Sequence, residues 1–97
     1  MTIKASTISI HPKTIECGLW AIERYLMQKY GCDAAARDME PLKWYINTGR
    51  ASVSFISRLL ICKPFMIGRI LHEGGSYDEM ILRVKNYVAN HTGYNFD

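Results

Sequence analysis

The chain has 97 residues, of which 48% are hydrophobic, and this is enough for one globular domain with a modest core. It carries a net charge of +3 and has no apolar run long enough to span a bilayer, no secretory signal and no C-x-x-C pair. We therefore expect a single cytoplasmic domain over residues 1–97, with no membrane partner, disulfide framework or zinc site.

Residues 1–11 are predicted to form an arm or a short strand. The segment TIKASTISI (2–10) is rich in Thr, Ile and Ser with rough alternation, which favours extended structure. A lone strand needs a partner, so this segment either pairs with a second copy of the chain or stays an unpaired, ordered arm.

The spacing of apolar residues predicts a helix from Pro12 to Tyr30. Proline loses nothing in a first helical turn, and Gly31 is a natural stop. The apolar positions are Ile15, Leu19, Ala21, Ile22, Leu26 and Met27. Beyond Gly31, Asp33 is expected to cap a short Ala-rich turn at 34–36. A separate helix should then start at Pro41 and end near residues 47–49.

Two short helices are predicted in residues 50–72, RASVSFISRLLICKPFMIGRILH. They should be separated at Lys63–Pro64, because a residue before proline avoids the α region. The first helix should begin at Ser52 or a neighbouring residue. Its inward-facing side chains should be Val53, Ile56, Leu59 and Leu60. The second should bury Met66, Ile67, Ile70 and Leu71. Its other face should present Phe65, Gly68, Arg69 and His72.

A final helix is predicted from the capping box of Ser76 and Glu79 through about Asn90, and residues 76–97 form this helix and a tail. Its apolar face is Met80, Ile81, Val84, Tyr87 and Val88. The predicted fold class is mainly α: four to five helices with a central helix-turn-helix, winged-helix-like with the wing absent or reduced, plus the N-terminal strand if it forms.

The positive charge is concentrated in residues 50–72, which hold four basic residues and no acidic one. Residues 1–49 hold six basic and five acidic residues, and residues 73–97 hold two basic and four acidic ones. A positive patch on a compact helical hairpin is what a duplex phosphate backbone attracts.

A helix-turn-helix places its second helix in the major groove of DNA. Basic side chains there neutralise phosphates or reach base edges, and hydroxyls at a helix start can hold a phosphate. The predicted DNA-binding residues are Arg50, Ser52, Ser54, Arg58, Lys63, Arg69 and His72.

Residues 41–75, PLKWYINTGRASVSFISRLLICKPFMIGRILHEGG, resemble the winged-helix gamma domain of FtsK-type DNA translocases over about a third of the chain. The positions in register are Thr48, Ala51, Ser52, Ser54, Arg58, Arg69, Ile70 and Glu73. The resemblance implies a winged-helix-like domain that binds double-stranded DNA. The family's Ile-Gly-Tyr-Asn-Arg is replaced by CKPFM at 62–66, and a helix follows where the family has its wing, so the resemblance supports the architecture more than the sequence specificity.

No nucleotide-binding loop, metal-ligand spacing or catalytic grouping is visible, so we expect neither an enzyme nor a cofactor. The acidic residues are interpreted as solvated surface charge, and Cys17 and Cys62 as buried small hydrophobes. The leading hypothesis is a small DNA-binding protein acting as a transcriptional regulator or accessory factor.

The alternative is a protein-binding inhibitor or adaptor, such as one encoded by a mobile element, that docks on a larger host complex. Its support is a supply of aromatic residues typical of interfaces. These are Trp20, Tyr25, Tyr30, Trp44, Tyr45, Tyr94 and Phe96. A homodimer paired through the last helix is compatible with either function.

Overall fold

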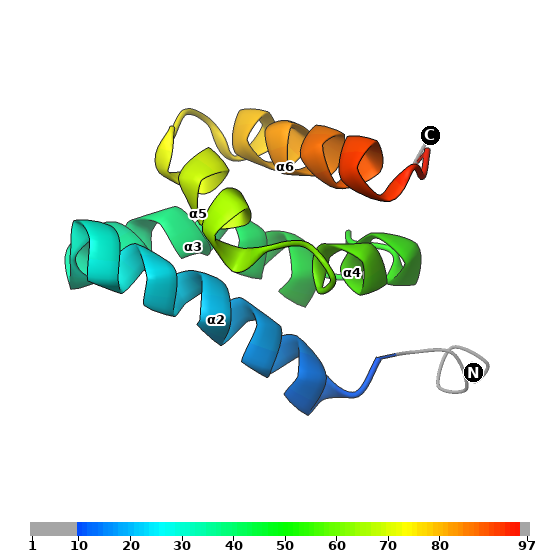
Figure 1. Ribbon diagram of the computed structural model, residues 1–97, viewed down its shortest axis with the longest axis horizontal. Helices are drawn as coiled ribbons and strands as arrows, with labels where there is room; N and C mark the ends of the chain where they lie inside the picture. The colour runs from blue at the N-terminus through cyan, green and yellow to red at the C-terminus, as the bar shows by residue number, and fades with distance from the viewer. Residues whose placement is uncertain (1–9, 96–97) are drawn as a thin grey trace.

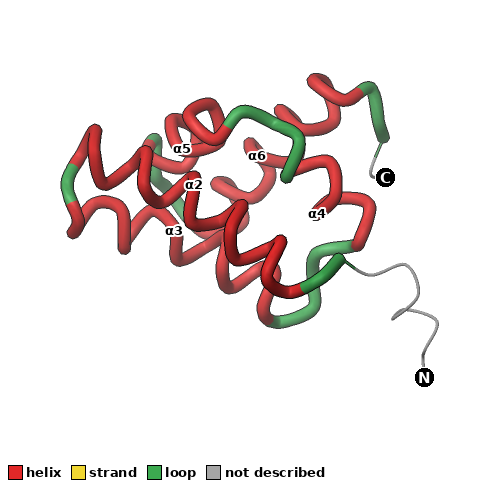
Figure 2. Tube along the Cα trace, turned by 60° about the horizontal axis from the view of Figure 1, so that its bottom comes forward, coloured by secondary structure: helices red, strands yellow, loops and turns green. Residues whose placement is uncertain are grey.

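The structure is a computed structural model that describes residues 10–95, and this range forms five helices (Figure 1). They are α2 (Pro12–Tyr30), α3 (Cys32–Asn47), α4 (Val53–Leu59), α5 (Pro64–His72) and α6 (Tyr77–Thr92). Figure 2 shows only helices and loops in this part of the chain, which confirms the mainly α class. The predicted strand at 2–10 lies outside the described residues, apart from Ile10.

The helices form two levels with α5 between them (Figure 1). Helices α2 and α3 pack side by side and reverse direction at Gly31, whose φ of 97° lies in the region that favours glycine. Helix α5 packs on α2 and α3 from one side and on α6 from the other. Helix α4 packs on α6 at one end of the molecule.

Every helix contributes to one continuous core. Its largest fully buried hydrophobic side chains are Leu26, Met39, Pro41, Leu42, Phe55, Leu59, Ile67, Leu71, Val84 and Val88. Gly68 is buried as well, although the sequence pattern placed it on the exposed face of α5. A β-carbon at Gly68 would lie 2.6 Å from a ring atom of Tyr25, so the missing side chain is what lets α5 approach α2.

The prediction of two separate elements between residues 32 and 49 is wrong, because α3 runs through both. Pro41 lies inside this helix, where proline lacks the N–H of a normal helical hydrogen bond and usually breaks or kinks the helix. It is fully buried, and packing of α3 against its neighbours holds the turns on either side together. Asp33 lies in the first turn and makes no capping hydrogen bond.

The predicted helices of residues 52–72 both form, with the break where Lys63–Pro64 places it. Ser52 caps α4 by accepting a hydrogen bond from the backbone N–H of Phe55 at 3.1 Å. The inward stripe of α4 is Phe55, Ile56 and Leu59, so the expectation that Val53 faces inward is wrong. Val53 is the first residue of the helix and is 36% exposed.

The capping box of α6 is confirmed in both directions: Ser76 Oγ accepts from the N–H of Glu79 at 3.2 Å, and Glu79 Oε1 accepts from the N–H of Ser76 at 2.9 Å. Its predicted apolar face is turned to the core. The helix ends at Thr92, and Gly93 follows in the left-handed conformation with φ of 69°. Within residues 10–95 no helix is both long and apolar enough to cross a membrane.

Candidate nucleic-acid interface

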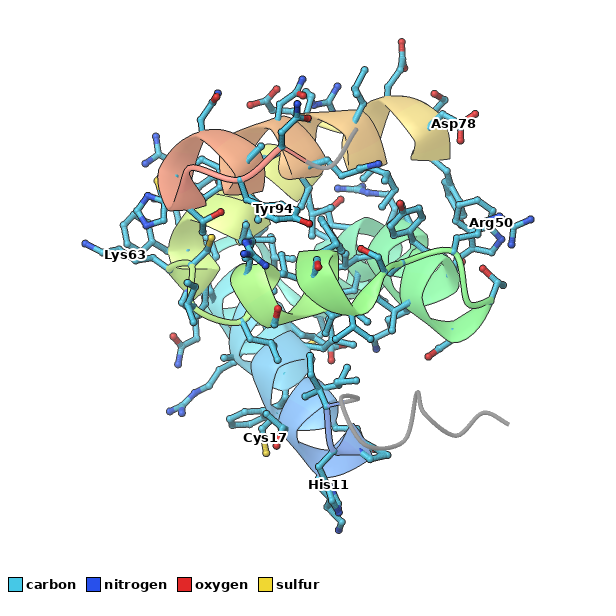
Figure 3. All side chains as sticks on the ribbon, turned by 90° about the vertical axis from the view of Figure 1, so that its right-hand side faces the viewer. His11, Cys17, Arg50, Lys63, Asp78 and Tyr94 are labelled. Carbon is cyan, nitrogen blue, oxygen red and sulfur yellow. The ribbon has the colours of Figure 1, made fainter. Side chains whose placement is uncertain are left out.

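The predicted DNA-binding residues are spread over α4, its two flanking loops and one side of α5. Figure 3 views the end of the molecule that carries α4, and Lys63 and Arg50 lie at opposite edges of that face. Tyr94 lies between them, and Asp78 marks the acidic start of α6 on the same side as Arg50. We name the surface of α4 and the loops 48–52 and 60–63 the α4 surface.

Arg58 occupies the middle of the α4 surface and stacks on an aromatic ring. Its guanidinium carbon lies 3.7 Å from the ring centroid of Tyr94, which is cation–π geometry. Its Nη1 also donates to the backbone carbonyl of Ser54 at 3.4 Å, four residues earlier in the chain. The side chain is therefore held in one orientation, although it is partly exposed.

Arg50 repeats this arrangement at the edge of the surface. Its guanidinium carbon lies 4.6 Å from the ring centroid of Trp44, and that ring packs in turn against Tyr77. Arg50 is exposed. Two of the predicted phosphate contacts are thus arginines that lie over aromatic rings.

Lys63 and Arg69 are both exposed, at the start and in the middle of α5. Helix α5 packs on α2, α3 and α6 through its buried residues Ile67, Gly68 and Leu71, while Pro64, Phe65 and Arg69 are exposed. Phe65 itself contacts Tyr25 at a ring separation of 6.4 Å. The expectation that Met66 and Ile70 are buried is only partly right, because both side chains are partly exposed.

The hydroxyl groups of the two serines of the predicted site already form hydrogen bonds within the chain. Ser52 caps α4, as described above. Ser54 Oγ lies 3.4 Å from the hydroxyl of Tyr94, and its carbonyl accepts from both Ser57 and Arg58. Both serines thus serve to fix the start of α4 and the position of its arginine.

The structure places His72 in a contact that the sequence pattern did not reveal. Its Nδ1 lies 2.7 Å from Oδ2 of Asp38, and its ring stacks on Tyr30 with a centroid separation of 3.5 Å. Asp38 is 1% exposed and also accepts from Nε of Arg37 at 3.2 Å. The interpretation of the acidic residues as solvated charge is therefore wrong for Asp38.

A signal for this buried carboxylate does exist in the sequence. Ala35, Met39 and Leu42 form an apolar stripe at helical spacing, and Asp38 falls on the same stripe. A charged residue on a core-facing stripe needs a partner, since an unpaired buried charge is costly. Nothing local identifies that partner, because His72 is 34 residues away.

The cysteines differ in exposure. Cys62 is buried as predicted, and burial raises the pKa of its thiol. The prediction for Cys17 is wrong: it lies on the outward side of α2 and is exposed, as is Cys32. Among residues 10–95 no group of three or more His, Cys, Asp or Glu side chains is arranged to hold a metal ion.

No protein-family model, curated protein or solved structure matches this chain. Its function is therefore inferred from the residues of the chain itself.

Proposed function

We propose that this protein binds double-stranded DNA through the α4 surface and acts as a transcriptional regulator or accessory DNA-binding factor. In a helix-turn-helix the second helix, here α5, enters the major groove. The proposal instead makes the α4 surface the main contact and keeps Arg69 of α5 as a candidate base contact. The main contacts it assigns are to phosphates rather than to bases.

The observation that carries the proposal is the absence of acidic partners around the basic residues of this segment. Arg50, Arg58, Lys63 and Arg69 form no ion pair with any described side chain. The chain has no Asp or Glu from residue 41 to residue 72. Three of these cations, Arg50, Arg58 and Lys63, lie on the α4 surface. Unpaired cations there are available to neutralise phosphates and release the counterions of DNA, which is the main source of sequence-independent affinity.

The basic residues on α4 and α5 are expected to make different contacts with DNA. Arg50, Arg58 and Lys63 follow the edge and middle of the α4 surface, where a phosphate backbone can run along them. Arg69, on the exposed stripe of α5, is the residue best placed to reach a base edge. His72 is assigned to the fold instead, because its Nδ1 already contacts Asp38.

The test is a fluorescence-anisotropy titration of the full chain against random duplex DNA at several salt concentrations. If Arg50, Arg58 and Lys63 each contact a phosphate, log K should fall with log salt with a slope of about −3. Absence of binding at low salt would refute the proposal.

Single substitutions locate the surface. Arg58→Ala and Lys63→Ala should each weaken binding and make the salt slope shallower by about one unit, without unfolding the protein. Lys29→Ala is the matched control, because Lys29 is exposed, also has no ion pair within residues 10–95, and lies at the end of α2 opposite α4 (Figure 1). Equal effects of all three changes would show that only net charge matters.

A second candidate function, the protein-binding adaptor, is favoured by one observation on α2 and α3. Trp20 is 56% exposed, and it lines a hollow between α2 and α3 of about 280 Å³. Exposed tryptophans are frequent anchors at interfaces. Arg24 lies over the Trp20 ring at 5.3 Å, and most of that ring is still exposed. The other described aromatic residues of the alternative hypothesis also pack against rings or cations of the chain itself, and Phe96 lies outside the described residues.

Trp20→Ala separates the two candidates. An adaptor would lose capture of its partner in a pull-down with this variant and keep it with Arg58→Ala. A DNA-binding protein would show the reverse pattern in the anisotropy titration.

A further inference from the structure

Tyr94 belongs to the C-terminal segment, yet it contacts α4, which lies about 40 residues earlier in the chain. Gly93 adopts the left-handed conformation after α6, and this turns the chain back toward α4. The ring of Tyr94 then lies against the guanidinium of Arg58. In Figure 3 Tyr94 lies between α4 and α6, near the middle of the face that carries Lys63 and Arg50.

The contact, together with one hydrogen bond, restrains the position of the Arg58 guanidinium. The centroid distance of 3.7 Å is that of a stacked pair, and the carbonyl of Ser54 holds Nη1 at 3.4 Å. A stacked guanidinium keeps the N–H groups at its edge free to bind a phosphate in bidentate fashion. An arginine that is already ordered loses less conformational entropy on binding than one that moves freely in solution.

We propose that Tyr94 is a positioning residue that presents the Arg58 guanidinium to a DNA phosphate. The inference rests on the proposed function and deepens it, because it assigns a role in DNA binding to the C-terminal segment. Sequence patterning had placed Tyr94 with the protein-binding alternative. Trp44 makes a similar cation–π contact with Arg50, with 4.6 Å between the guanidinium carbon and the ring centroid.

The experiment is a double-mutant cycle in the anisotropy titration, with Tyr94→Leu and Arg58→Ala singly and together. Tyr94→Leu keeps an apolar side chain and removes the aromatic face, so it should weaken binding roughly two- to tenfold. The salt slope should stay at the wild-type value because no cation is lost. In the Arg58→Ala background, Tyr94→Leu should have no further effect, since the residue through which it acts is gone.

Arg50→Ala supplies the matched control for the cycle. Tyr94→Leu should weaken binding by the same factor in this background as in the wild type, because Arg50 is positioned by a different ring. Thermal unfolding of each variant confirms that the titrations compare folded proteins. A second readout needs no DNA: the Nε–H signal of Arg58 in an NMR spectrum of the free protein should shift in Tyr94→Leu, while that of Arg69 should not.

The outcomes distinguish this inference from the function on which it rests. If the wild type binds no DNA, both fail. If the wild type binds and the effects of Tyr94→Leu and Arg58→Ala are additive, only the positioning role fails. Tighter binding by Tyr94→Leu would also overturn it, because the ring would then be covering Arg58 rather than presenting it.

Discussion

Substitution of His72 by phenylalanine tests whether this residue belongs to the fold or to the DNA interface. Phenylalanine preserves a flat ring that can stack on Tyr30, and it removes the Nδ1 atom that lies 2.7 Å from Asp38. The Asp38 side chain is 2% exposed, so its Oδ2 would lose its partner with little access to water.

The expected cost follows from that burial. A buried acceptor left without a partner costs about 1–3 kcal/mol, and Arg37 still satisfies the other oxygen of Asp38. For a domain of this size each kcal/mol lowers the melting temperature by about 4–8 °C. We therefore expect His72→Phe to melt roughly 5–20 °C below the wild type in circular dichroism, and to bind DNA with unchanged affinity at a temperature where both are folded.

The double variant Asp38→Leu with His72→Phe supplies the control. Replacing both polar partners by apolar groups leaves no unsatisfied carboxylate, so much of the lost stability should return. An unchanged melting temperature of His72→Phe together with lost DNA affinity would refute the reasoning, because His72 would then act on DNA and not on Asp38.

Three further outcomes are expected. Gly68→Ala should destabilise the protein by about 1–2 kcal/mol in urea unfolding, since the 2.6 Å approach to Tyr25 costs more than the helix propensity gained. Hydrogen bonds from Ser76 lower the pKa of Glu79, so its ionised form stabilises the fold above the ordinary pKa of glutamate. That stability is lost as the pH falls through the lowered pKa. Glu79→Gln should therefore reduce the fall in melting temperature that the wild type shows as the pH drops below the ordinary pKa of glutamate. With a thiol reagent the native protein should titrate the two exposed cysteines quickly, whereas Cys62 should react only on unfolding; three fast thiols would contradict its burial.

Local signals along the chain set the positions where most helices begin and end. Ser52, Pro64 and the capping box at Ser76 set the starts of three helices, and Gly31 sets the end of α2. These signals are readable because each acts on backbone groups within three or four residues. The concentration of positive charge in residues 50–72 is likewise a property of composition alone.

Which helix faces contact one another depends on tertiary packing, which local signals do not specify. Pro41 stays inside α3 because burial outweighs its local tendency to end a helix. Packing of α5 against α2 buries Gly68, which the helical spacing placed on the exposed face. The pairs Asp38–His72 and Arg58–Tyr94 join residues more than 30 positions apart. Contacts of this kind arise when helices pack, and no spacing rule within a helix encodes them.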